Sequence, residues 1–305
     1  GHVQANAEEC VRRAIATLRD ATYTYHMDPD YDGQDRKIEV KISVDHDARS
    51  ATVDFTGTTA QLKTNYNAPE PVTMAAVLYV FRLLVADDIP MNEGVMKPLK
   101  VILPKGTMLS PAYPAAIIAG NVETSQAVTS ALLLALGVQA AAQSTMNNTT
   151  WGNARHQYYE TICGGSGAGR LADGTGHPGT GGVHTHMTNS RLTDPEVLEW
   201  RFPVVLDEFS IRRGSGGEGR WRGGDGTRRK TRFLEAMTLA VLTGHRVVPP
   251  PGLEDGGPGA KGVGRVIRAE GDTEELRSAD RTELAPGDIY WLDTPSGGGF
   301  TPFGE

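Results

Sequence analysis

Residues 164–182 read GGSGAGRLADGTGHPGTGG, and nine of these nineteen residues are glycine. A second segment of this kind, residues 214–226, contains seven glycines among thirteen residues. Around both segments, apolar and polar residues alternate in short runs that are typical of β-strands, at 157–162, 183–188, 203–212, 237–243 and 288–292. The chain beyond residue 150 is therefore predicted to consist of β-strands separated by glycine-rich loops.

The chain before residue 150 has a different pattern, in which helical and strand periods are mixed. The predicted elements are a short helix, a β-hairpin, a long helix, a buried strand and a second long helix, at 10–18, 38–55, 72–86, 99–103 and 124–143. The predicted fold class is therefore α+β. Residues 1–150 form a mixed α/β part with two main helices, and residues 151–305 form the β-rich part of the same subunit.

Composition limits the class of protein. An apolar share of 39% in 305 residues suffices for a hydrophobic core, and a net charge of −7 without a basic stripe does not suit nucleic acid. The longest apolar run, residues 131–142, is shorter than the roughly 20 residues of a membrane span, so no membrane association is expected. Cys10 and Cys163 lack metal-binding spacing, and the amino end lacks the pattern of a secretory signal. We expect a cytoplasmic globular protein.

The glycine-rich segments contain two matches to the dinucleotide-binding pattern G-x-G-x-x-G, at 174–179 and 214–219. That pattern binds a pyrophosphate because a helix N-terminus follows it, and no helix is predicted after either match. The P-loop pattern G-x-x-x-x-G-K-[ST] does not occur in the sequence. If ATP is used, a partner or another fold must bind it.

A first polar cluster, GNVETSQ at 120–126, stands where a loop is predicted to become a helix. Its side chains and the free backbone N–H groups of the first helical turn could together face an anion or a polarised carbonyl. Ordinary helix capping would explain one or two of these residues. Capping does not explain Asn121, Glu123 and Gln126 together, so these three are candidate site residues.

Two further polar clusters follow along the chain. In STMNNTT at 144–150, Asn147 and Asn148 could donate to an oxyanion, although a plain turn would have a similar composition. In the predicted strand 157–162, Tyr158 and Glu160 share one face. Glu160 could act as a base or orient one, and a solvated surface glutamate is the alternative.

The segment VHTHMTN at 183–189 is predicted to place His184 and His186 on one strand face, where two imidazoles could bind one substrate or one metal ion. Two ligands are too few to predict a metal site, and paired histidines also occur in plain hydrogen-bond networks. Cys163 is a further alternative as a nucleophile, because the amides of the glycine-rich segment after it could lower its pKa. No G-x-S-x-G serine motif occurs.

Several blocks resemble, in the same order, those of the hydantoinase B/oxoprolinase family. They are NYNAP (65–69), PMNEG (90–94), GNVETSQ (120–126), TMNN (145–148), YET (159–161), GVHTHMTN (182–189), RGGDG (222–226) and TPSGGGF (294–300). The resemblance extends over essentially the whole chain, but it covers only the carboxyl-terminal portion of the family's much longer B-type subunits. The last block departs from the family, whose members commonly have an unbroken glycine run after the proline.

Members of this family open cyclic amides such as hydantoins and 5-oxoproline at the expense of ATP, and similar subunits occur in acetone and acetophenone carboxylases. The resemblance therefore implies a hydantoinase-A-like partner that binds ATP and phosphorylates the substrate oxygen. It also implies that the amino-terminal half of the B-type subunit and a small-molecule substrate take part. In related carboxylases a divalent metal is held by His and Asp residues of that half, so no metal ligand is assigned to this chain.

We therefore expect the carboxyl-terminal half of the B-type subunit of an ATP-dependent cyclic-amide hydrolase, active only with its partner and its missing half. The candidate catalytic residues are Glu123, Glu160, His184 and His186. The candidate substrate-binding residues are Asn121, Gln126, Asn147, Asn148 and Asn189. Two alternatives stay open: a subunit of an ATP-dependent ketone carboxylase, and a non-catalytic scaffold for the ATP-binding partner.

Overall fold

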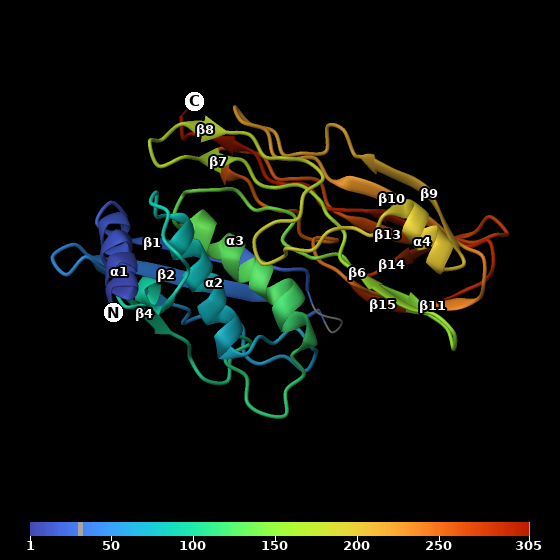
Figure 1. The fold of residues 1–305 in the computed structure, drawn as a ribbon, viewed down its shortest axis with the longest axis horizontal. Helices are drawn as coiled ribbons and strands as arrows, with labels where there is room; N and C mark the ends of the chain where they lie inside the picture. The colour runs from blue at the N-terminus through green and yellow to red at the C-terminus, as the bar shows by residue number, and fades with distance from the viewer. Residues whose placement is uncertain (30–32, 305) are drawn as a thin grey trace. The chain divides into compact units, whose positions relative to one another are not determined.

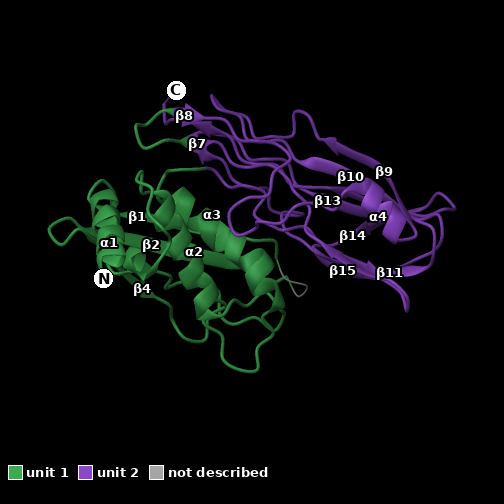
Figure 2. Ribbon diagram, viewed as in Figure 1, with its two compact units in different colours: residues 1–139, 170–175 green, residues 140–169, 176–305 purple. Residues whose placement is uncertain are grey.

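The computed structural model describes residues 1–29 and 33–304, and the fold is α+β, as predicted (Figure 1). The chain forms two compact units (Figure 2). Unit 1 contains residues 1–139 and 170–175, and unit 2 contains residues 140–169 and 176–305. Among the described residues, no helix is long and apolar enough to cross a membrane.

Unit 1 is built on a four-stranded sheet. Its strands, in sheet order, are β1 (Ala21–His26), β2 (Lys37–Asp45), β3 (Ser50–Asp54) and β4 (Leu99–Ile102). The predicted hairpin is β2 with β3, and β4 pairs with β3 in parallel. Ile38, Val40 and Ile42 are fully buried, as their alternation with polar residues predicts.

In the part of unit 1 that the structure describes, the α-helices are α1 (His2–Ile15), α2 (Glu70–Leu83) and α3 (Ser125–Ala135). A 3₁₀ turn, Glu93–Met96, precedes β4, and a π-helical turn, Gly120–Thr124, precedes α3. α3 packs against β1 and β2, and α2 packs against α3. Because α3 has neighbours on both sides, all of its residues from Ser125 to Leu134 are buried, polar ones included.

The predicted helix at 124–143 is wrong in its second half. α3 ends at Ala135, and Gly137 follows with φ +66°, which is a left-handed conformation that favours glycine. The apolar residues Ala140 to Ala142 are buried, as predicted, but they belong to neither a helix nor a strand. Their small side chains let the backbone hydrogen-bond to glycine-rich segments, as when Ala140 N donates to Ala168 O (2.8 Å).

Among the described residues of unit 2, the two largest sheets enclose one hydrophobic core. The first has the order β14-β13-β16-β10-β9 and consists of β9 (Val204–Ile211), β10 (Thr227–Phe233), β13 (Val263–Ile267), β14 (Thr273–Leu276) and β16 (Ile289–Asp293). The second has the order β15-β11-β5-β6 and consists of β5 (Asn148–Gly152), β6 (Gln157–Glu160), β11 (Met237–Leu242) and β15 (Ala279–Leu284). Neighbouring strands within each of these sheets are antiparallel.

The core between these sheets includes Trp151 and Leu239 from the second sheet and Phe233 and Leu292 from the first. The short helix α4 (Pro195–Arg201) contributes Leu198. Its N-cap is Asp194, whose carboxylate accepts from the backbone N–H groups of Glu196 and Val197. The remaining strands are short: β7 (Gly169–Arg170), β8 (Gly176–His177), β12 (Leu253–Glu254) and β17 (Phe300–Thr301).

The glycine-rich segments, expected as loops, are packed backbone against backbone. Gly224 N donates to Ser166 O (2.8 Å), and Gly297 N donates to Gly224 O (2.9 Å), so three segments distant in sequence form one hydrogen-bonded layer. A Cβ atom on Gly297 would lie 1.8 Å from Ser166 O, and one on Gly165 would lie 1.9 Å from Gly224 O. Glycine is required here because the neighbouring backbone occupies the space of a side chain.

The predicted strand at 183–188 is wrong. Val183 forms one isolated bridge with Gly164, and the chain then turns, with His186 at φ 54°. A residue in this left-handed conformation cannot continue a strand. His184 and His186 therefore do not share a strand face.

We predict that Gly297→Ala destabilises the protein by at least about 2 kcal/mol, because the added methyl group overlaps a backbone carbonyl that cannot move independently. Gly264→Ala is the matched control, since a Cβ atom on Gly264 would meet only ordinary contacts of 3.7 Å or more. Chemical denaturation of both variants measures the difference. Equal stability of the two variants would contradict the backbone-packing explanation.

Candidate active site

The first polar cluster lies in unit 1, on the π-helical turn Gly120–Thr124 and the start of α3. A Cβ atom on Gly120 would lie 2.4 Å from Asn67 O, so glycine allows this turn to approach the loop that carries the NYNAP block. Thr124 Oγ1 donates to Tyr66 O (2.6 Å) in the same loop. Two sequence blocks that are 55 residues apart (65 to 120) are therefore neighbours.

The three candidate residues of this turn differ in exposure. Glu123 is 1% exposed and Gln126 is fully buried, whereas Asn121 is exposed. π-helical turns within α-helices occur frequently at functional sites. A buried carboxylate on such a turn fits a functional role better than a solvated helix cap, and the roles of Asn121, Glu123 and Gln126 stay predictions.

In unit 2, Glu160 at the end of β6 is a buried ion-paired carboxylate and not a solvated one. Its Oε2 pairs with the guanidinium of Arg229 on β10, and its Oε1 accepts from the backbone N–H of Thr193 (2.6 Å). The side chains of Glu160 and Arg229 are 5% and 9% exposed. The pair satisfies two charges that would each be costly to bury alone.

The two asparagines of the second cluster are held by protein contacts. Asn147 is fully buried, and its amide donates to Gln143 Oε1 (2.8 Å) and Ile162 O (3.2 Å). Asn148 begins β5, and its Oδ1 accepts from the Tyr159 hydroxyl (2.6 Å). Both amides therefore already bind groups of the protein, and a role in substrate binding stays a prediction.

His184, His186 and Asn189 lie on the turning segment that follows Gly182. Desolvation lowers the pKa of His184, and the charge of Glu160 acts in the opposite direction. Desolvation also lowers the pKa of His186, to about 4. Both imidazoles are thus neutral near pH 7, and Asn189 is exposed. In residues 1–29 and 33–304, no group of three or more His, Cys, Asp or Glu side chains could hold a metal ion.

Cys163 does not fit the role of a nucleophile. Burial raises the pKa of its thiol, although a hydrogen bond with Thr227 acts in the opposite direction. The cysteine is 4% exposed, so it packs as a small apolar residue. The expectation that the following glycine-rich segment lowers its pKa is wrong, because the amides of that segment are used in backbone packing.

Several buried polar atoms around residues 161–165 have no hydrogen-bond partner among the described residues. They include Gln143 Nε2, Thr161 Oγ1 and both ring nitrogens of His184. Backbone hydrogen bonds join their segments, since Gln143 N donates to Gly165 O and Val183 N donates to Gly164 O. Unsatisfied buried groups in one neighbourhood are the expected signature of a site for a polar ligand or ordered water.

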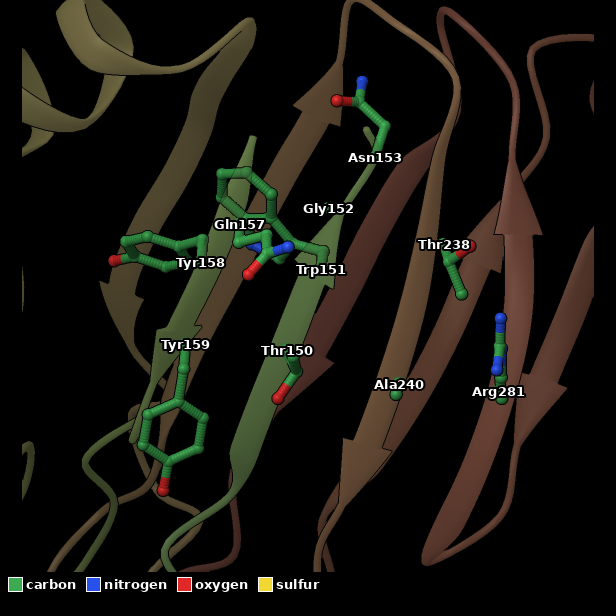
Figure 3. A pocket seen from close by; sticks show the side chains of 10 residues that line it. All are labelled: Thr150, Trp151, Gly152, Asn153, Gln157, Tyr158, Tyr159, Thr238, Ala240 and Arg281. Carbon is green, nitrogen blue, oxygen red and sulfur yellow. The ribbon is translucent and has the colours of Figure 1, made fainter. Parts of the chain in front are cut away.

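A separate groove of about 610 Å³ lies on the face of the sheet β15-β11-β5-β6 that is turned away from the core (Figure 3). Its floor is made of small side chains on the two central strands, such as Thr150 and Ala240, and Tyr159 and Arg281 stand at the two edges. Glu160 lies on the opposite face of the same sheet. The groove is therefore distinct from the polar neighbourhood of Glu160.

The structure brings together only part of the predicted set. Glu160 and His184 lie within electrostatic reach of each other in unit 2. Asn147 is close to Glu160 in the chain fold, because its amide donates to the carbonyl oxygen of Ile162, two residues after Glu160. The other unit 2 residues are on the groove side of β5 (Asn148), on the turn (His186) or on the surface (Asn189). Asn121, Glu123 and Gln126 belong to unit 1.

Two residues with a clear structural part in this site, Arg229 and Thr193, were not predicted. Arg229 belongs to the basic run 228–232, in which one arginine cannot be told from the next by composition. The usable signal is the alternation of Thr227, Arg229 and Thr231, all of which are buried on β10. Thr193 acts through its backbone, which no sequence pattern reports.

Comparison with known proteins identifies the class. The Hydantoinase B/oxoprolinase family model matches residues 1–302, and the chain belongs to this family. The sequence is 40% identical over 310 residues to 5-oxoprolinase 1 of Arabidopsis thaliana, which covers 98% of this chain and 24% of that protein. The chain thus spans about a quarter of the length of that relative.

Two solved structures have the same fold. An ATP-dependent caprolactamase from Pseudomonas jessenii matches with a TM-score of 0.80 and 23% identity, over 98% of this chain and 54% of that one. A nucleotide-free acetone carboxylase matches with a TM-score of 0.79 and 16% identity, over 97% of this chain and 47% of that one. At these identities the likeness concerns the fold alone.

We predict that the stability of the protein falls as the pH is lowered from 6.5 to about 4, in part because of His186. The folded state keeps this imidazole neutral down to about pH 4, whereas the unfolded chain binds a proton near pH 6.5, so protons favour unfolding between these values. Each pH unit in this interval corresponds to about 1.4 kcal/mol for one such group.

The free energy of unfolding of His186→Asn, measured at pH 7 and pH 5, tests whether His186 causes the loss of stability. Asparagine is a suitable replacement because it tolerates the positive φ and does not titrate. The loss of stability between the two pH values should be smaller in the variant. An unchanged loss would show that His186 is not the titrating group.

Proposed function

We propose that this chain is the carboxyl-terminal half of the B-type subunit of an ATP-dependent cyclic-amide hydrolase of the hydantoinase/5-oxoprolinase type. The observation that supports it most directly is the 40% identity to a 5-oxoprolinase over 98% of the chain. The substrate is activated by phosphorylation in an A-type ATP-binding partner. Family membership supports the cyclic-amide class.

The chemistry of such a reaction explains the residue types of the site. An amide is a poor electrophile until its oxygen becomes a leaving group, and attack by water then forms a tetrahedral centre with a developing negative charge. Asn121, Gln126, Asn147, Asn148 and Asn189 are the proposed amide groups for substrate binding. Glu123, Glu160, His184 and His186 are the proposed catalytic groups.

Within this set, His184 fits proton transfer from water best. Its imidazole is neutral because its pKa is lowered, and neither ring nitrogen has a hydrogen-bond partner in the described part of the chain. A neutral imidazole with a free nitrogen can accept a proton from an attacking water molecule. Glu160, which pairs with Arg229, lies within electrostatic reach of His184 and would stabilise the imidazolium that results.

ATP and any divalent metal are assigned outside this chain. The sequence contains no P-loop, and the described side chains provide no complete set of metal ligands. On the basis of the family resemblance, we propose that the A-type partner binds ATP and that residues outside this chain hold most of the ligands of any divalent metal. The enzyme is proposed to work in the cytoplasm as a hetero-oligomer.

A ketone carboxylase is the second candidate, because the sequence blocks of this chain also resemble those of acetone and acetophenone carboxylase subunits. Both reactions begin with phosphorylation of a carbonyl oxygen by the partner, and they differ in the nucleophile that follows. A non-catalytic scaffold for the partner is the third candidate.

We predict that the complete enzyme containing this chain opens 5-oxoproline or a hydantoin with turnover of ATP. His184→Ala should lower kcat by about 100-fold or more, since it removes the proposed base. His177→Ala, on the short strand β8 outside the proposed site, should retain activity. Product formation and ATP hydrolysis are measured together for each enzyme.

Two outcomes would reject this function. ATP turnover coupled to bicarbonate and a ketone, without ring opening, would establish the carboxylase. Unchanged turnover in Asn121→Ala, Glu123→Ala and His184→Ala, together with weaker association of the subunits, would establish the scaffold.

A further inference from the structure

The segment from His184 to Leu192 is anchored at both ends within unit 2. At its start, Val183 and Gly164 exchange two backbone hydrogen bonds, of 2.9 and 3.2 Å. At its end, the backbone N–H of Thr193 donates to Glu160 Oε1 (2.6 Å). The first anchor is backbone to backbone, whereas the second includes a hydrogen bond to one buried carboxylate.

That carboxylate is itself held from β10. Arg229 donates to Glu160 Oε2, so the two oxygens of Glu160 have different partners, one on β10 and one on the segment end. Both side chains are nearly excluded from solvent. Without Arg229, the carboxylate would be buried as an uncompensated charge, which is costly, so its contacts would have to rearrange.

Thr193 has a second contact, from the strand that carries Glu160. The Tyr158 hydroxyl donates to Thr193 Oγ1 (3.0 Å), and the Tyr158 ring stacks on Trp151 at 4.5 Å between centroids. Figure 3 shows these two rings next to each other on the neighbouring strands β6 and β5. Thr193 is thus bound at its amide and at its hydroxyl by two residues of one rigid strand.

His184 depends on these anchors for its position. Neither of its ring nitrogens has a hydrogen-bond partner among the described residues, so the orientation of the ring is not fixed by bonds of its own. The packing around the ring and the backbone on either side therefore hold it. A site residue without bonds of its own needs a supporting set of contacts to reach a productive geometry.

We propose that Arg229 is a positioning residue for the reaction: by holding Glu160 it clamps Thr193 and so fixes the segment that carries His184. This rests on the proposed function in one respect, namely that His184 takes part in the reaction. The clamp itself is a statement about the structure of unit 2 and can be tested without activity.

The test compares Arg229→Gln, Arg229→Lys and Arg228→Gln in the complete enzyme. Arg228 is the matched control. It directly precedes Arg229 on β10, so its side chain lies on the opposite face of the strand, where it pairs with Asp293 (2.8 Å) and is more exposed to solvent. Arg229→Gln should lower kcat about 10- to 100-fold with a smaller effect on KM, since a misplaced base affects the transition state more than binding. Arg229→Lys should recover part of the loss, and Arg228→Gln should retain activity.

Hydrogen exchange of the peptide spanning residues 184–194 is the second measurement, and it does not require turnover. Exchange should be faster in Arg229→Gln than in Arg228→Gln. Tyr158→Phe removes one contact to Thr193 and leaves the ion pair, so it tests the clamp if Arg229→Gln does not fold. It should also speed exchange and lower kcat.

If hydrogen exchange of residues 184–194 is unchanged in folded Arg229→Gln, the clamp is rejected. If Arg229→Gln does not fold, unchanged exchange in Tyr158→Phe rejects it. Faster exchange with unchanged kcat would reject its part in positioning. If the enzyme opens neither substrate, the proposed function fails, and the exchange result still decides whether the clamp exists.

Discussion

Backbone-to-backbone contact between glycine-rich segments is the constraint on which unit 2 depends. In most β-sandwiches the space between chains is filled by side chains, and here carbonyl oxygens fill it. Backbone hydrogen bonds join the segments around residues 165, 224 and 297 to one another. These segments are so close together that a Cβ atom would not fit between them. The layer can form only where each segment has glycine at the contact, and this explains why the glycine content is concentrated in a few stretches.

The candidate site residues of unit 2 are found where this layer joins the sandwich. Gln143 and Asn147 precede the layer, Glu160 ends the strand that leads into it, and His184 follows the glycines at 181 and 182. The backbone N–H and C=O groups of the layer hydrogen-bond to one another. The polar side chains at the margin of the layer are therefore the groups that could bind or act on a substrate. Burial at this margin also explains the electrostatics, since the buried carboxylate of Glu160 is paired with Arg229 and desolvation lowers the pKa of both histidines.

Much of the fold could be predicted, because amphipathic alternation reports directly which residues face a core. The hairpin of β2 and β3 and the strands β9, β11 and β16 are examples. The errors arose where tertiary contacts override local pattern. The alanine-rich run at 140–142 reads as helix but pairs with glycine chains, and the segment at 183–188 alternates like a strand but turns at His186. In the site, residue types predicted the polar clusters, whereas the inward direction of Arg229 and the backbone role of Thr193 depend on pairing that one sequence does not reveal.

The glycine layer also affects how the stability of unit 2 depends on temperature. Exposure of apolar surface raises the heat capacity of unfolding, and exposure of polar surface lowers it. Unfolding the layer exposes mainly peptide groups, which are polar, and few apolar side chains. Per residue, the layer therefore contributes less heat-capacity change than the sandwich core beside it. A smaller heat-capacity change gives a flatter stability curve, so this part of the protein loses less of its stability on cooling than a conventional hydrophobic core of the same length.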